Sequence, residues 1–299
     1  MLSQKTDKER GILALIVLAI VFASMGLFAR YLATGFLLFQ QVYLRMLAAF
    51  VIGILVFGKH IQLAKFRLLS KKDWALIFLR AISYALFGII LYTQAIIITK
   101  YSNVSFIGSL PTTAVFGFIL LKEKLSIKKF VLVLLAFAGV VLISVQDFSN
   151  LLSWGRGEVL TLISIIFFSL SYIARKWQSD TLNNYELTVI NFLVAFVIVF
   201  LVSLVKGDGL PVANWNMSLV LMVIGAGIFN IANVFLTNYG FQRVEAVLAS
   251  NILMLESCFA VVFGFVFYQE IPLAKEFLGG LIIIASVIAM NKTESREGK

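Results

Sequence analysis

The sequence predicts an all-α integral membrane protein of ten transmembrane helices, built as two five-helix repeats in opposite orientation. Three observations predict this fold class: the composition, ten apolar stretches of spanning length, and a partial repeat of the first half in the second. Apolar residues make up 61% of the 299 positions, charged residues make up 13%, and the mean hydropathy is +0.99. A soluble domain carries roughly 25% charged residues. The solvent of this chain is therefore predicted to be lipid.

Ten apolar stretches have the ~17–25 residues that a helix needs to cross the hydrocarbon layer. Only helices and closed barrels satisfy every backbone group inside a membrane, and long stretches without period-two alternation favour helices. The predicted helices cover residues 12–29, 38–57, 75–98, 103–121, 128–145, 158–174, 186–205, 217–238, 245–268 and 272–290.

The connections between these stretches differ in charge from one side of the membrane to the other. Ten crossings place 18 Lys and Arg residues on the side of the two termini and 5 on the opposite side. The positive-inside rule then places both termini in the cytoplasm. The net charge of +10 is predicted to set this topology and to contact lipid headgroups, not nucleic acid. The four tryptophans lie at predicted helix ends, where headgroups favour them: Trp74, Trp154, Trp177 and Trp215.

The sequence nearly repeats itself at an offset of about 146 residues. Ala114–Phe130 reads AVFGFILLKEKLSIKKF and Val261–Phe277 reads VVFGFVFYQEIPLAKEF. Since five helices are an odd number, the second copy enters the membrane upside down, which is typical of alternating-access transporters with a binding site between the halves. We predict a first repeat over residues 11–145, a second over 157–290, and cytoplasmic tails at 1–10 and 291–299.

The repeated motifs resemble those of a known family. The first copy has Ser109-Leu110-Pro111, Leu121–Leu125 and Ala138-Gly139-Val140, and the second has Leu255-Glu256-Ser257, Tyr268-Gln269-Glu270 and Ala285-Ser286-Val287. With Arg45 in the second helix, the chain resembles the drug/metabolite transporter superfamily, in its EamA-like branch, over nearly its whole length. Ser257 stands where this family often has proline, so the sequence does not decide whether the ninth helix is interrupted as the fourth is expected to be at Pro111. Ser286 replaces the glycine of the second Gly-Val.

The resemblance implies a secondary carrier for small metabolites, often an exporter. It implies a central cavity lined by the first, third, fourth, sixth, eighth and ninth helices. It does not imply a substrate, because the superfamily handles amino acids, sugars, nucleotide sugars and drugs.

Ionisable side chains at membrane depth indicate a functional site by default. Glu256 lies halfway along the ninth helix, and we interpret it as a contact for a substrate amine or as a protonatable coupling group. The structural alternative is a packed glutamate bonded to a neighbouring helix.

Polar and aromatic residues follow one predicted face of the third helix. Arg80, Tyr84, Gly88 and Tyr92 recur at four-residue spacing, although Arg80 can also extend to the interface. The eighth helix has a matching face, which fits a substrate cavity between the two helices. Polar contacts that only hold helices together would produce the same pattern. The residues predicted to bind substrate are Glu256, Arg80, Tyr84, Tyr92, Ser109, Tyr172, Asn230 and Asn233.

Three further charged residues are assigned structural roles. Arg45 is predicted to have a structural partner, since the second helix is an outer helix in the family that the chain resembles. Glu123 and Glu270 are predicted to be solvated charges at helix ends, with gating or helix capping as the alternative.

The sequence offers no catalytic set. One histidine and one cysteine cannot form a metal site or a nucleophile–base pair, and no phosphate-binding loop for ATP is present. We predict no enzyme activity, no cofactor and no metal. The favoured function is a secondary active or facilitative transporter in the plasma membrane, with export favoured, for small organic metabolites such as amino acids. The alternative is a non-transporting scaffold or receptor. Proton coupling and a homodimer are left open.

Overall fold

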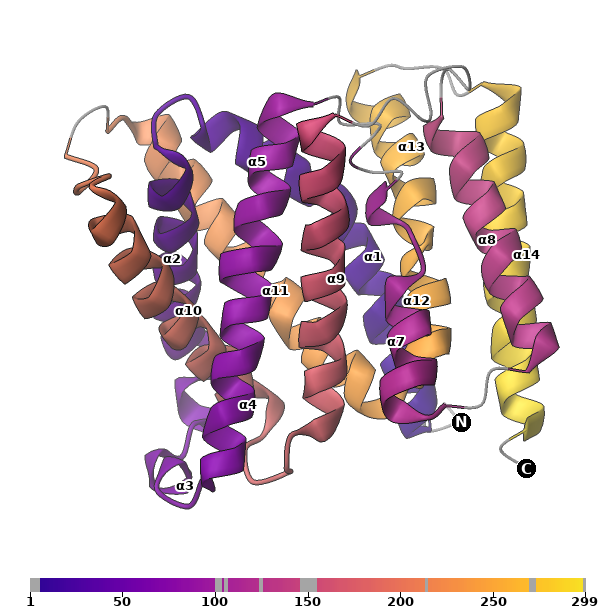
Figure 1. Cartoon of the computed structure of the whole chain (residues 1–299), viewed down its shortest axis with the longest axis horizontal. Coiled ribbons are helices and arrows are strands. Elements are labelled where there is room, and N and C mark those ends of the chain that lie inside the picture. Colours follow the sequence, from indigo (N-terminus) through magenta and orange to yellow (C-terminus); the bar gives the residue numbers. More distant parts are fainter. Residues whose placement is uncertain are drawn as a thin grey trace.

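The computed structural model describes residues 6–99, 104, 107–123, 126–145, 155–212, 215–268 and 273–297. These residues form helices and their connections, without a strand among them. The all-α class is therefore confirmed. Figure 1 shows a bundle in which the start of the first helix and the end of the last lie at the same edge. Some predictions concern residues outside the described ranges: Trp154, Lys124, Leu125, Gln269, Glu270 and the outer ends of both tails.

The first repeat contains the helices up to residue 144. Its third predicted helix is one continuous rod whose middle is π-helical. The elements are α1 (Asp7–Leu32), α2 (Leu38–Phe57), the 3₁₀ turn η1 (Gly58–His60), α3 (Leu63–Phe66), α4 (Lys71–Ala81), the π-helical segment η2 (Ile82–Ile89), α5 (Ile90–Ile98), α7 (Thr112–Leu121) and α8 (Ile127–Ser144).

The second repeat follows the same order of helices. Its elements are α9 (Arg156–Trp177), α10 (Asn184–Lys206), α11 (Met217–Arg243), α12 (Ala246–Leu253), α13 (Leu255–Tyr268) and α14 (Ala274–Glu297). In Figure 1, α1 begins at the lower edge of the bundle and α9 at the upper edge.

Polar residues at the N-termini of the helices fix where they begin. The side chains of Thr6, Ser70 and Asn183 each accept a hydrogen bond from the backbone N–H three residues on, and the carboxylate at that position accepts one from the backbone N–H of the cap. Such reciprocal caps satisfy backbone donors that the first helical turn leaves unpaired. The connections therefore hold the helix starts at the membrane surfaces.

Seven of the described helices are long and apolar enough to cross a membrane. They are Asp7–Leu32, Leu38–His60, Lys71–Ile98, Arg156–Trp177, Asn184–Lys206, Met217–Arg243 and Ala274–Thr293. Thr112–Leu121 and Ala246–Phe259 are shorter apolar helices, and they occupy the predicted fourth and ninth stretches. Many large apolar side chains are exposed on the outside of the bundle, where lipid would cover them. The chain is a multi-pass membrane protein.

A helix of one repeat makes contacts similar to those that its counterpart makes in the other repeat. α1 packs on α11, and its counterpart α9 packs on the α4–η2–α5 rod. α2 packs on α11, as α10 packs on α4 and η2. Two contacts join counterparts to each other, α2 with α10 and α8 with α14, and α7 of the first half packs on α12 of the second. The bundle therefore has a two-repeat architecture.

One of these contacts, between α8 and α14, depends on glycine. A Cβ atom at Gly139 would lie 2.6 Å from the Gly279 carbonyl oxygen, and one at Gly279 would lie 2.6 Å from the Gly139 carbonyl oxygen. Small residues allow helix backbones to approach in this way inside membranes. The repeated Ala-Gly-Val motif thus has a packing role in its first copy.

Candidate functional site

Two helices, one from each repeat, are interrupted near the middle of the bundle. In the first repeat the chain makes a turn at Ser109 and Leu110, and α7 begins after Pro111. In the second repeat α12 ends at Leu253 and α13 begins at Leu255. The expected break at Pro111 is present. The ninth predicted helix is also interrupted, at Met254, although Ser257 is not proline.

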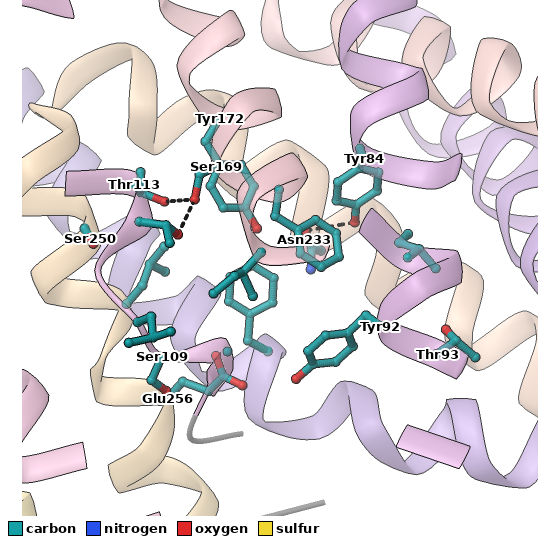
Figure 2. A pocket seen from close by; sticks show the side chains of 18 of the residues that line it. Tyr84, Tyr92, Thr93, Ser109, Thr113, Ser169, Tyr172, Asn233, Ser250 and Glu256 are labelled. Atoms are coloured by element: carbon teal, nitrogen blue, oxygen red, sulfur yellow. Dashed lines mark hydrogen bonds between the residues drawn. The ribbon is translucent and has the colours of Figure 1, made fainter. Parts of the chain in front are cut away.

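A cavity of about 140 Å³ lies where these interruptions meet α1, α2, α5, α9 and α11. An apolar cavity of ~150 Å³ holds one benzene molecule, so the space suits a small organic solute. Figure 2 shows the lining side chains converging from several helices. Because hydroxyls, amides and aromatic rings share this lining, the cavity can hold both polar and apolar groups of a ligand.

Aromatic rings form one wall of the cavity. Phe168 on α9 lies 5.6 Å from Tyr84, 6.0 Å from Tyr92 and 6.4 Å from Tyr172, measured between ring centroids. The Tyr84 hydroxyl donates a hydrogen bond to the Asn233 Oδ1 atom, at 3.2 Å. This bond joins the third helix of the first repeat to the third helix of the second, so a tyrosine face and an amide face line the same space.

A hydroxyl cluster fixes the start of α7. Ser169 Oγ on α9 lies 2.7 Å from Thr112 Oγ1 and 2.9 Å from Thr113 Oγ1, within hydrogen-bonding distance (Figure 2). These three residues also line the cavity. Thr112 and Thr113 were not among the predicted site residues, and the sequence signal for them is their position directly after the helix-breaking Pro111.

Glu256 lies in the first turn of α13 and lines the cavity beside Ser109 (Figure 2). A helix N-terminus favours a carboxylate because its backbone N–H groups carry partial positive charge. Glu256 makes no hydrogen bond or ion pair with another residue of the described chain. The structural alternative, a glutamate bonded to a neighbouring helix, is therefore not what the structure contains.

The structure brings seven of the eight predicted site residues to this cavity: Glu256, Tyr84, Tyr92, Ser109, Tyr172, Asn230 and Asn233. Arg80 instead lines a separate void of about 10 Å³ with Tyr84, Ser171 and Thr237. Tyr84 lines both spaces, so Arg80 lies one turn beyond the cavity on the same rod, on the far side of Tyr84. Gly88, also on the predicted stripe, lies against Phe168.

Arg45 corrects a prediction. It was expected to have a structural partner, but it lines the cavity, and its Nε and Nη1 atoms have no hydrogen-bond partner in the described part of the chain. Helix α2 therefore contributes to the cavity, although the sequence placed it outside.

Glu123 corrects a second prediction. It was expected to be a solvated helix-end charge, but its side chain is only 10% exposed. Its carboxylate accepts the backbone N–H groups of Ala246 and Val247, at 2.9 and 3.1 Å, and pairs with Lys176 at 3.3 Å. Glu123 thus joins the end of α7 to the start of α12 in the other repeat.

These features define a class of protein. A multi-pass helical bundle of two repeats, with interrupted helices around a central cavity, has the architecture of a membrane transporter. The family model described as EamA-like transporter family matches residues 9–145 and 155–292. The chain therefore belongs to the EamA-like transporter family and is a membrane transporter.

The chain is similar to proteins that are already known. The uncharacterized transporter sll1164 of Synechocystis sp. is 26% identical over 257 residues, which cover 81% of this chain and 72% of that protein. A solved crystal structure of a protein without further description superposes with a TM-score of 0.76 at 14% identity, covering 95% of this chain and 98% of that one. At this identity the match shows the fold alone.

Proposed function

We propose that the protein is a secondary active or facilitative transporter that exports small organic metabolites, such as amino acids, across the plasma membrane. Ten helices, in two inverted repeats, alternate between inward-open and outward-open arrangements around the central cavity. The observation that carries the proposal is the cavity itself, which lies between one interrupted helix of each repeat. Interrupted helices place polar backbone and helix ends at membrane depth, where they can contact a solute.

The count of ten crossings combines the seven long helices with α7, α8 and the α12–α13 pair. α8 packs along α14, its counterpart in the other repeat, and Figure 1 shows the two as neighbours of similar extent. With ten crossings both termini are on one side, and the basic residues of the connections favour the cytoplasm for that side.

The edge at which both termini lie is held closed in this conformation. Glu123 bonds α7 to the start of α12, and Lys129 pairs with Glu245 at 3.1 Å beside it. Both contacts cross from the first repeat to the second. Alternating access requires that they open, so we assign them to the gate on the terminal side.

The cavity supports a small solute that carries an amine. Glu256 is a carboxylate without a partner in the described chain, and it lies beside aromatic rings and hydroxyls. A protonated amine would satisfy that carboxylate, and a proton would satisfy it when no amine is bound. Glu256 is therefore the residue at which proton coupling would act.

Transport by the purified chain tests the proposal. The protein would be reconstituted in liposomes, and uptake of a metabolite panel would be measured with and without an imposed proton gradient, with protein-free liposomes as the control. At least one small amine-bearing solute is expected to move faster than in the control. Movement of no solute in either condition would contradict the proposed function. Inside-out vesicles from expressing cells would then give the direction.

A further inference from the structure

Two arginines lie at membrane depth in this chain, and they differ in their partners. Arg45 and Arg80 are each 3% exposed. Arg80 donates to the Ser171 carbonyl oxygen, to Gln178 Oε1 and to Asn238 Oδ1, at 3.2, 2.7 and 2.5 Å. Each of its three side-chain nitrogens has a partner in the protein. Arg45 leaves Nε and Nη1 without a partner in the described chain.

Asn230 is a second unsatisfied polar side chain on the same cavity. It is fully buried on α11, which packs against α2, and neither its Nδ2 nor its Oδ1 atom has a partner among the described residues. Arg45 and Asn230 both line the central cavity. Unpaired buried donors are costly, and a buried cation without a counter-charge is more so. Donors left open on a cavity indicate that the bound molecule completes them.

No described residue of the cavity supplies the missing counter-charge. Glu256 is the only carboxylate among the described residues that line the cavity, and it forms no ion pair with Arg45. Tyr84 interacts electrostatically with Arg45, but its hydroxyl donates a hydrogen bond to Asn233. An arginine fork matches a carboxylate or a phosphate. A carboxylate fits better here, because one cation and a nearby glutamate disfavour a doubly charged anion.

We propose that Arg45, with Asn230 as an additional amide donor, forms a carboxylate-binding subsite in the central cavity. The proposal deepens the proposed transport function and rests on it, because the ligand is the transported solute. An organic acid group is then part of what the cavity recognises, and its removal weakens binding even when the rest of the solute is unchanged.

Binding of matched acids and amides tests this subsite without requiring transport. The full chain in nanodiscs would be titrated with benzoate and benzamide, and with L-alanine and L-alaninamide, in buffer free of carboxylates and phosphate. The wild type should prefer the acid of at least one pair by roughly tenfold to a hundredfold, the factor that a hydrogen bond to a charged group contributes. Equal affinities within every pair, or no binding of any probe, would overturn the subsite.

Substitutions test whether Arg45 causes the preference for the acid over the amide. Arg45→Gln should erase the acid preference while amide binding stays, and Arg45→Lys should retain part of it. Arg80→Gln is the matched control, since it alters the other buried arginine and should leave the acid-to-amide ratio unchanged. Should Arg45→Gln fail to fold, Asn230→Asp serves instead, because a new negative charge in the cavity should lower acid affinity and spare the amide. An acid-to-amide affinity ratio that stays at the wild-type value in Arg45→Gln, or in Asn230→Asp if that variant replaces it, contradicts the proposal.

Two further results separate the alternatives. Inorganic phosphate at equal concentration should not displace the acid, and displacement would assign the subsite to phosphate esters and overturn the carboxylate. A wild type that binds the acid selectively but transports nothing would overturn the transport function and support the subsite. A wild type that transports the acid and the amide equally would support the transport function and overturn the subsite.

Discussion

Glu256 and Arg45 are two ionisable side chains on one cavity, and both lack partners in the described chain. Ionisable groups at membrane depth are normally paired with each other or with backbone. Arg80 obeys that rule and cross-links three segments of the bundle. The contrast separates residues that hold the helices together from residues that remain available to a solute.

Glu256→Gln tests the acidic member of this set. Glutamine keeps the shape of glutamate but cannot carry charge or exchange a proton, so transport of the amine-bearing solute should fall at least tenfold, or lose its pH dependence. Expression and thermal stability should stay near wild type, because Glu256 makes no bond that the substitution would break. Initial rates in liposomes at several pH values measure the effect. Glu9→Gln, an exposed carboxylate at the start of α1, is the control. Unaltered rates and pH profile would remove Glu256 from the mechanism.

Residue-level prediction from the sequence worked where one residue carried the signal. Glu256 stood out because a carboxylate inside an apolar stretch is rare. Arg45 was the same kind of signal, yet it was assigned a structural partner, since no local pattern reveals which face of α2 meets the cavity. Phe168 gave no signal, because aromatic residues are common in membrane helices, and the only signal for Thr113 was its position just after Pro111.

At the scale of elements, irregular helices line the cavity together with the regular helices α1, α9 and α11. α7 and the α12–α13 pair are interrupted, and the third helix contains the π-helical segment η2. Hydropathy located all of these segments, because the length of an apolar stretch is a local property. It could not locate the π-helical segment, which packs against α9 and α10.

Among the regular helices, α8 and α14 owe their close crossing to two glycines, and Gly139→Ala tests it. The added Cβ would meet the Gly279 carbonyl oxygen at 2.6 Å, so the backbones must separate. Such overpacking costs about 1–3 kcal/mol. The unfolding temperature in mild detergent should therefore fall. Gly58→Ala is the control, because a Cβ there has no neighbour within 4 Å. Equal unfolding temperatures for the two variants would show that the crossing does not limit stability.

At the scale of the whole molecule, the repeats meet through contacts of two kinds. The cavity contacts include hydroxyls and amides, such as the Tyr84–Asn233 hydrogen bond. At the terminal edge, Glu123 and Lys129 make charge-assisted contacts from the first repeat to the second. The repeat in the sequence predicted that two halves would face each other. It did not predict Glu123 as their link, since its partners are backbone N–H groups 123 and 124 residues away.

Glu123→Ala tests whether this link holds one conformation of the transporter. The substitution removes two charge-assisted hydrogen bonds to the start of α12, each worth about 1.5–3 kcal/mol. Because these bonds exist only while the terminal edge is closed, their loss should shift the population toward the state that is open at that edge. Asn233→Cys in a Cys258→Ser background would report the shift through labelling by a membrane-impermeant thiol reagent added from the side of the termini.

The labelling rate at that cysteine should rise at least tenfold with Glu123→Ala, since 1.4 kcal/mol changes a population tenfold. Glu276→Gln is the matched control: Glu276 accepts a backbone N–H at the start of α14 but links no repeats. It should leave the rate unchanged. A rate unaffected by Glu123→Ala would mean that the terminal edge is closed by other contacts. The bonds of Glu123 would then stabilise the fold without taking part in the exchange between conformations.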